Sequence, residues 1–286
     1  MSIVNGLLLI IAWQSAAPAP SSPPPSIHGG DREMTCPVGG EKFTALVTDM
    51  FSSYGERPDG RRYTYWLMPL PLPECPSNKL VLFQAFTDAE AARLAPLIAS
   101  PEYQALLRQE DTTYYRAQWL ATRIGRPERE ALWMLLTATW QVKPAPGPVG
   151  QGRVSAAKAR AYDEEFVRRV RALEPATDDK EYQALWYRAA NAQRELGRFA
   201  EAGDMLRSLE AWLAGADPGH WGDAVKALEL VVARRDASVE PLDAIPKVDA
   251  ALACLDHAPR DPFGVEFCAR AEIRELVERF QAARKH

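Results

Sequence analysis

The sequence predicts a mostly helical α+β fold, with a small β unit near the N-terminus and an α-helical array after it. Two observations support this fold class. In residues 43–47 and 62–68, apolar side chains recur at every second position, as in half-buried strands. From residue 87 onward, helix-capping sequences and apolar residues three or four positions apart recur instead, as in amphipathic helices. The 286 residues are enough for one large or two modest cores.

The N-terminus resembles an export signal. The compact apolar stretch 6–13 is followed by the small residues Ser15, Ala16 and Ala17, which a signal peptidase accepts. The stretch is too short for a membrane span, which needs about 20 apolar residues. We therefore expect a signal peptide over 1–17, with membrane contact only if this segment stays uncleaved. The alternative is a buried N-terminal helix, and the absence of Lys or Arg before residue 6 leaves that alternative open.

Residues 18–30 are rich in Pro, Ser and Gly and predict a flexible tether, because this composition cannot bury a core. Residues 31–86 predict the β unit, with strands near 43–48 and 62–68 and a short apolar strand at 79–83. Asp59 and Gly60 provide a turn before the second strand. The proline-rich stretch 69–73 cannot join a central strand, because proline lacks the backbone donor.

Two short phrases in the β unit each look like half of a zinc knuckle. They begin Cys36-Pro37 and Cys75-Pro76, and Gly39 and Asn78 stand where a C-x-x-C pair would have its second cysteine. The spacing predicts a degenerate zinc-ribbon-like unit that has kept one cysteine in each knuckle.

Helices are expected over 87–142 and again over 153–286, separated by a Pro- and Gly-rich linker at 143–152. In the first segment Thr87 and Glu90 match a capping box, and Ser100 and either Thr112 or Thr113 are candidate helix starts. In the second, Asp261-Pro262 is expected to cap one continuous final helix that runs past residue 280.

One predicted helix pair resembles a tetratricopeptide repeat. Small Ala190 and Ala202 allow close approach of the helices, Gly197 makes the turn, and Trp186 and Phe199 fill the space between them. The resemblance implies a tetratricopeptide-like array over 153–286. Because one helical hairpin cannot bury its own face, neighbouring helices must complete the stack.

The order of these features over residues 34–210 is similar to a family of uncharacterised bacterial proteins. Members open with a CPVCG-type phrase, carry a second CP-x-C phrase after a β segment, and continue into tetratricopeptide-like helices. Here Cys36-Pro37-Val38 and Cys75-Pro76 match the pattern, while Gly39 and Asn78 depart from it. The resemblance implies a fold, and no activity.

The four cysteines permit two interpretations. An exported chain favours disulfides, with Cys36 bonded to Cys75 and Cys254 to Cys268, the second bond joining two antiparallel helices. The alternatives are a residual metal site at the first pair and buried free thiols at the second. Two thiolates alone make a poor zinc site, so we expect no bound metal and no cofactor.

Catalytic signatures are missing from the sequence. It has no G-x-S-x-G elbow, H-E-x-x-H motif or phosphate-binding loop. Its four histidines are far apart, and the acidic run 163–165 is expected to be a solvated helix face. The aromatic residues between 114 and 140 are expected to pack in the core. With a net charge of -4, the chain shows no basic footprint for nucleic acid.

A protein- or peptide-binding surface is the expected function. Tyr187, Asn191 and Arg194 lie four and three residues apart, on a helix face that lines a peptide groove in tetratricopeptide repeats. The alternative is that these three positions pack or face water. We therefore expect an exported, non-enzymatic interaction protein, periplasmic or secreted. The alternatives are a cytosolic metal-binding protein with an incomplete zinc ribbon, and an envelope hydrolase without a recognisable motif.

Overall fold

The computed structural model of the chain describes residues 29–48, 50–65, 68–144, 154–214, 219–257, 259 and 261–285. The expected signal peptide and residues 18–28 of the expected tether lie outside these described residues. The part of the chain that is described is mostly helical, with a small N-terminal β unit of two sheets, which confirms the expected α+β class.

The β unit has two antiparallel hairpins. One pairs β1 with β2 and the other pairs β3 with β4. The bounds are β1 Gly30–Thr35, β2 Lys42–Val47, β3 Ser53–Glu56 and β4 Arg62–Thr64. The predicted strand at 79–83 is wrong, because this stretch forms only an isolated bridge between Val81 and Glu74. Leu80 and Val81 are instead buried in a core that includes Leu94 and Leu120, so the run is apolar because it packs against helices.

Eleven helices follow in the described residues. Their bounds are α1 Asp88–Ile98, α2 Pro101–Arg108, α3 Thr113–Arg123, α4 Glu128–Val142, α5 Ala156–Arg171, α6 Lys180–Glu195, α7 Phe199–Leu213, α8 Gly219–Ala233, α9 Lys247–Asp256, α10 Pro262–Ala269 and α11 Ala271–Ala283. The expected helix starts are confirmed. Thr87 and Glu90 form a capping box at α1, and Ser100, Thr112 and Asp261 cap α2, α3 and α10.

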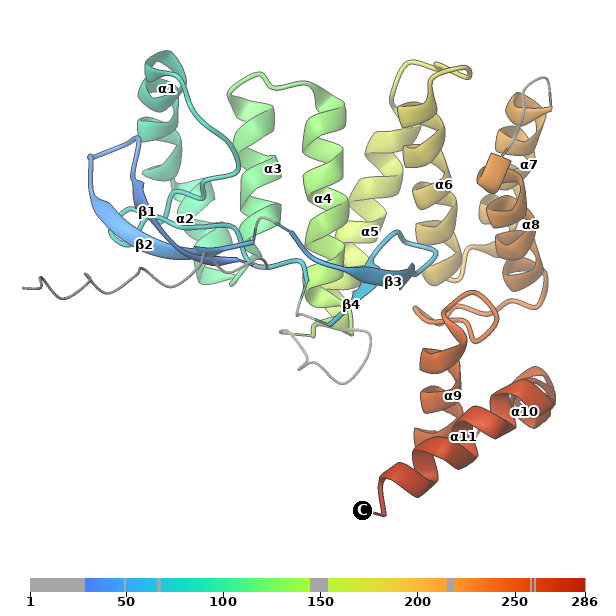
Figure 1. Ribbon diagram of the computed structural model, residues 1–286. Coiled ribbons are helices and arrows are strands. Elements are labelled where there is room, and N and C mark those ends of the chain that lie inside the picture. The colour runs from blue at the N-terminus through green and yellow to red at the C-terminus, as the bar shows by residue number, and fades with distance from the viewer. Residues whose placement is uncertain are drawn as a thin grey trace, which may run out of the picture.

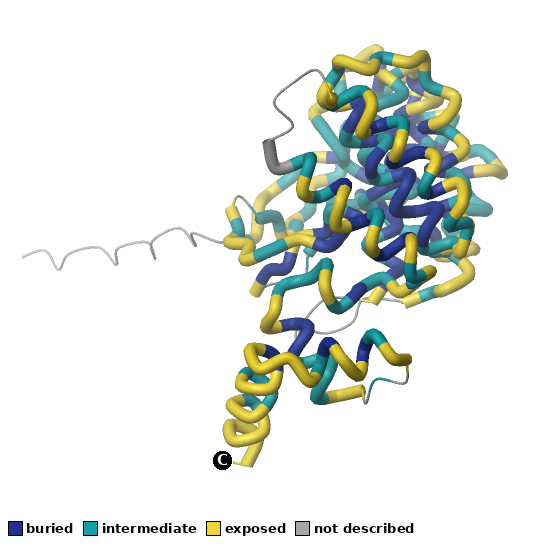
Figure 2. The backbone as a smooth tube through the Cα atoms, turned by 90° about the vertical axis from the view of Figure 1, so that its right-hand side faces the viewer, coloured by how far each residue is buried: buried dark blue, intermediate teal, exposed yellow. Residues whose placement is uncertain are grey.

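Helices α1–α8 stand in a row (Figure 1), and from α3 to α8 each helix packs against the next. Their shared apolar core extends from Leu132 on α4 to Val232 on α8, and Figure 2 shows these buried positions gathered inside the row. Residues 145–152 of the expected linker lie outside the described residues, and the helices on either side of it, α4 and α5, share one core. None of the described helices is long and apolar enough to cross a membrane.

Helices α9–α11 form a smaller unit below the row, with its own core of Ala251, Phe267 and Ile273 among others (Figures 1 and 2). The expected single final helix is wrong. The chain breaks at Arg270, which has the extended backbone angles φ -59° and ψ 137°. The break lets α11 turn back to pack against α9, which buries apolar side chains that a straight helix would expose.

Candidate functional site

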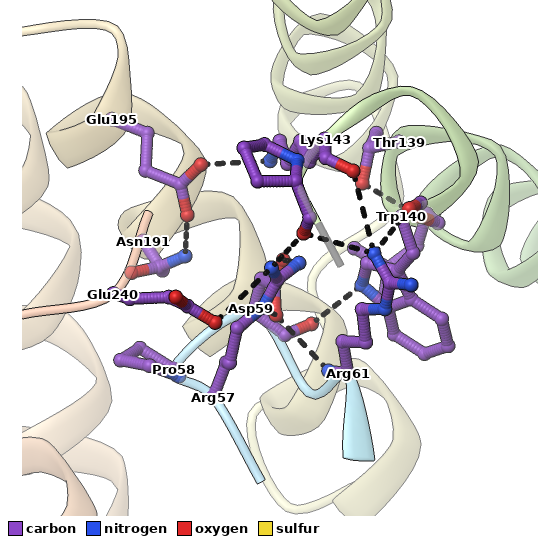
Figure 3. Close-up of polar contacts among 12 residues, drawn as sticks. Arg57, Pro58, Asp59, Arg61, Thr139, Trp140, Lys143, Asn191, Glu195 and Glu240 are labelled. Carbon is purple, nitrogen blue, oxygen red and sulfur yellow. Dashed lines mark hydrogen bonds and ion pairs between the residues drawn. The ribbon is translucent and has the colours of Figure 1, made fainter. Parts of the chain in front are cut away.

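The turn between β3 and β4 lies buried against the helical row (Figure 3). It closes through two backbone hydrogen bonds between Arg57 and its neighbours, from Arg57 N to Arg61 O at 2.9 Å and from Gly60 N to Arg57 O at 2.8 Å. Gly60 adopts φ +88°, which a side chain would strain. The charged side chains of Arg57, Asp59 and Arg61 are only 1, 2 and 4% exposed. Three charged side chains of this turn therefore lie in the protein interior, where an unpaired charge is costly.

Asp59 is the anionic centre of this turn. It accepts two hydrogen bonds from the Arg57 guanidinium, at 3.1 and 2.6 Å, and one from the Arg61 backbone N–H at 3.0 Å. Burial disfavours the charged carboxylate, but the attraction of Arg57 and Lys143 outweighs it and lowers the pKa of Asp59 to about 2. The Arg57–Asp59 pair is therefore ionised at neutral pH.

Lys143, at the end of α4, joins the turn to helices α5 and α6. Its Nζ lies 2.9 Å from Asp163 Oδ1 and 2.8 Å from a Glu195 oxygen, and all three side chains are buried. Burial raises the pKa of Asp163 to about 7, Lys143 opposes that rise, and Glu195 adds to it. One ammonium is thus shared between two buried carboxylates. The expectation that residues 163–165 form a solvated face is wrong for Asp163, because Lys143 binds it inside the core.

The helices also hold the main chain of the turn. Arg188 Nη1 on α6 donates to Pro58 O at 2.8 Å, and Trp140 Nε1 on α4 donates to Asp59 O at 3.2 Å. Arg188 Nη2 also pairs with Glu56 at 3.0 Å. Side chains of the row thus bind backbone carbonyls of a turn from elsewhere in the chain.

Tyr187, Asn191 and Arg194 all lie on α6, as the sequence predicts, but all three are buried. Tyr187 OH donates to Ala224 O at 3.3 Å on α8. Arg194 donates to Asn191 Oδ1 at 3.0 Å, and to the carbonyls of Asp236 and Ser238 at 2.8 and 2.6 Å. The structure therefore corrects the prediction that these three side chains face a partner. The α6 face is covered by α8 and by the segment after it, so these residues follow the packing alternative.

A cleft of about 600 Å³ opens beside the buried turn. Arg61 of the turn, Trp140 and Lys143 of α4, and residues at the starts of α3 and α5 line it. Its walls also include Pro69 and Pro71, from the proline-rich stretch that follows β4. The size falls within the range of small-ligand pockets, about 300–1,000 Å³.

The two half-knuckles form matching turns joined by a disulfide. In each, the cysteine N–H donates to a carbonyl five residues later, and its carbonyl accepts from the N–H four residues later. The bond links Cys36 to Cys75 with a Cα–Cα distance of 5.8 Å, and Cys254 bonds Cys268 at the same Cα–Cα distance, joining α9 to α10. Asn78 Nδ2 donates to Val38 O at 2.7 Å, so the residue that replaces a knuckle cysteine ties the two turns together.

Among the described residues no group of three or more His, Cys, Asp or Glu side chains is arranged to hold a metal ion. Both cysteine pairs are at bonding distance, so no described thiolate is free for a ligand role. The aromatic side chains between 114 and 140 pack against the two larger cores, as expected.

Most of the buried charges could not be predicted from the sequence. It identified Asp59-Gly60 as a turn, and nothing in the local pattern distinguishes Arg57, Arg61 or Lys143 from surface residues. The usable signal was the charged R-P-D-G-R stretch at 57–61, which carries three charges on a turn between strands.

Comparison with known proteins found no matching family model, no matching curated protein and no matching solved structure. The family resemblance of residues 34–210 therefore stays a sequence-based prediction.

Proposed function

We propose that the chain is an exported, non-enzymatic interaction protein of the bacterial envelope, whose helical row binds a protein or peptide. The observation that carries the proposal is that side chains of α4 and α6 bind the main chain of the β3–β4 turn. Arg188 and Trp140 donate hydrogen bonds to the carbonyls of Pro58 and Asp59, which are main-chain groups that a bound peptide also offers. Because this turn already fills one face of the row, the partner is proposed to bind at the open cleft beside it.

We further propose that α6 and α7 are a tetratricopeptide-like unit. Ala190 and Ala202 are fully buried at the contact between these helices. Gly197 makes the connecting turn with φ +77°. Trp186 Nε1 donates to Met205 O at 2.9 Å, which ties the first helix to the second. These contacts support the repeat-like role assigned to these residues.

Export to the periplasm is the proposed location, and the two disulfides support an oxidising, extracytoplasmic environment. The test is cell fractionation followed by intact mass. A chain lacking about 17 N-terminal residues, recovered outside the cytoplasm with no thiol that reacts under denaturing conditions, agrees with the proposal. A full-length cytoplasmic chain with reactive thiols and bound zinc would contradict it and favour the metal-binding alternative.

The β unit is proposed to be a zinc-ribbon-like fold that has lost two ligands. A Cβ built on Gly39 lies 3.9 Å from Asn78 Nδ2, so the positions of both missing cysteines lie close together. Gly39→Cys with Asn78→Cys, purified under reducing conditions, is expected to bind one zinc ion through four thiolates. The wild-type chain treated in the same way is the control, and equal zinc content in both would refute this proposal.

The binding proposal is tested by placing a photo-crosslinking amino acid in the cleft, at Val154, in the exported chain. Val154 is 44% exposed and lines the cleft, so the substitution leaves the core unchanged. The matched control is the same amino acid at Val265, which is 55% exposed on α10. A discrete adduct from position 154 and none from 265 supports the proposal, and adducts from neither position oppose it.

A further inference from the structure

The cleft beside the buried turn contains four cationic side chains, and three of them are neutralised by a carboxylate of the described chain. The three ion pairs are Arg116–Glu74 at 2.5 Å, Lys143–Asp163 at 2.9 Å and Lys158–Asp111 at 2.6 Å. The fourth cation is Arg61, and no described carboxylate lies within ion-pair distance of its guanidinium. A buried charge without a counter-ion is costly, so this position favours an added anion.

Part of the Arg61 guanidinium is held by backbone carbonyls at the end of α4. Nη1 donates to Trp140 O at 2.7 Å and to Pro144 O at 3.1 Å, and Nε donates to Met68 O at 3.1 Å. Figure 3 shows the contacts of Nη1 converging from α4. Among the described residues, none accepts a hydrogen bond from Nη2. The planar guanidinium is thus held through Nε and Nη1, and Nη2 can donate a hydrogen bond to a ligand.

Burial and repulsion from Arg57 lower the pKa of Arg61 to about 10, although Asp59 and Glu240 oppose this. The guanidinium remains charged at neutral pH, but its charge is poorly compensated by the surrounding protein. The negative end of the α4 dipole offsets a part of that charge, and an anion in the cleft would offset more.

Two further features of the cleft suit a carboxylate on an apolar body. Helices α3 and α5 begin at its edge, with their N-caps Thr112 and Ser155 among the lining residues, and helix N-termini favour anions. The second feature is an apolar wall of the cleft, which is formed by Trp140, Pro69 and Val142. A charged group at one point and apolar surface around it are typical of small organic-acid sites.

We propose that this cleft binds the carboxylate of an apolar organic acid, which accepts hydrogen bonds from Arg61 Nη2 while its apolar body packs against Trp140. The carboxylate belongs either to the C-terminal residue of a peptide or to a free acid. This inference rests on the proposed function only in placing the partner in the cleft, and it is tested on the purified chain without that partner.

The test is a titration with N-acetylphenylalanine, which carries the carboxylate of a peptide C-terminus, and with its amide, which lacks the charge. Binding is followed at the Trp140 indole N–H in ¹H–¹⁵N spectra, assigned by the Trp140→Phe variant. We expect the amide to bind at least tenfold more weakly, because it leaves the guanidinium without an anion, at a cost of about 1.4 kcal/mol or more. Equal binding of the acid and the amide, or no shift at Trp140 with either, would overturn the proposal.

A third titrant separates the two possible sources of the carboxylate, a peptide C-terminus and a free acid. Phenylpropionate has the same ring and carboxylate without the peptide bond. If it binds as tightly as N-acetylphenylalanine, the ligand is an apolar acid in general, and if it binds tenfold more weakly, a peptide terminus is the ligand. Failure of all acids, together with a crosslinked partner at Val154, would reject the carboxylate and leave the interaction proposal standing.

Two variants check the residue assignment. Arg61→Gln is expected to weaken acid binding at least tenfold and leave the weak binding of the amide unchanged, provided that the spectrum shows a folded chain. Because Arg61 also supports the end of α4, Val154→Glu is the second variant. It adds a negative charge at the exposed rim and is expected to weaken acid binding twofold to fivefold. Val265→Glu, remote on α10, is expected to have no effect. Equal effects of the two glutamate variants would contradict the assignment.

Discussion

The two β-hairpins have the same topology and opposite environments. In β1–β2 no residue is fully buried, and Leu46 is 52% exposed. In β3–β4, by contrast, Tyr63 and the charged turn are buried against the helices. An isolated two-stranded hairpin is marginal in water, so each must be held by something else. The first is anchored by a disulfide at its connecting turn, which contains Cys36, and the second is held by buried ion pairs.

The difference shows two physical ways to stabilise a two-stranded hairpin. The disulfide of the first hairpin acts mainly by restricting the unfolded chain, so it requires little burial. The ion pairs of the second hairpin act only in the folded state and depend on complete pairing, because a single unpaired buried charge is costly. The charged turn should therefore be much less tolerant of substitution than the strands of β1–β2.

The largest effect is expected from Asp59→Ala. The substitution leaves the buried Arg57 guanidinium without its bidentate partner, so the free energy of unfolding should fall by about 3–5 kcal/mol. Urea unfolding followed by tryptophan fluorescence measures this. The matched control is Asp31→Ala, because Asp31 is exposed on β1, and its cost should stay within about 0.5 kcal/mol. Equal costs at both positions would remove the distinction between the hairpins.

The next effect is expected from Cys36→Ser combined with Cys75→Ser. These residues are 39 apart in sequence, and losing the cross-link should lower the free energy of unfolding by about 4 kcal/mol in the chain-entropy model. The comparison is Cys254→Ser with Cys268→Ser, whose separation of 14 gives about 3 kcal/mol. Hydrogen exchange should locate the first loss in β1–β2 and the second in α9–α11. An equal loss of protection everywhere would argue against local anchoring.

A smaller effect is expected from pH at Asp163. Its folded pKa of about 7 lies above its ordinary value of 3.8, so the folded state retains this proton at higher pH than the unfolded state does. The stabilisation is complete below about pH 3.8 and is lost as the pH rises through about 7. A tenfold difference in proton affinity between the two states corresponds to about 1.4 kcal/mol. Wild type should therefore lose stability relative to Asp163→Asn between these pH values.

The measurement is the urea midpoint of both chains at steps across that pH range. The control is Asp178→Asn, which removes a carboxylate at an exposed position. The stability difference from wild type is compared between the two variants at each pH. A constant difference for Asp163→Asn would show that Asp163 is ionised throughout.

The smallest effect is expected from Leu46→Thr on the exposed face of β2. Threonine suits a strand, and the leucine side chain is half exposed, so the free energy of unfolding should change by less than about 0.5 kcal/mol. The comparison is Tyr63→Thr on β4, which removes a fully buried ring and its hydrogen bond to Glu240. That substitution should cost about 3–5 kcal/mol by analogy with buried aromatic truncations. A large cost at Leu46 would show that the β1–β2 face is covered.

The sequence predicted the features that depend on neighbouring residues. Thr87 with Glu90, Ser100 and Thr112 start helices where expected, because capping involves groups only two or three residues apart. The two cysteine pairs were also predicted from their context, and both lie at bonding distance.

Most residues of the candidate site could not be predicted from the pattern of neighbouring residues. Arg194 and Asp163 look like exposed helix residues, since each is polar and lies on an otherwise amphipathic helix. Their burial depends on Asp236, Ser238 and Lys143, which lie 42, 44 and 20 residues away. A pattern of period 3.6 describes one helix and carries no information about which distant segment will cover it.

By itself, then, the sequence determined the class of the fold and the capped starts of several helices, and it favoured the two disulfides, because each follows from chemistry within a few residues or from the context of the cysteines. Only the tertiary structure decided that the turn at 57–61 enters the helical row and that Arg61 meets the cleft without a carboxylate. Those outcomes depend on long-range pairing of buried charges, where the desolvation cost of each group is offset only by a partner from another element.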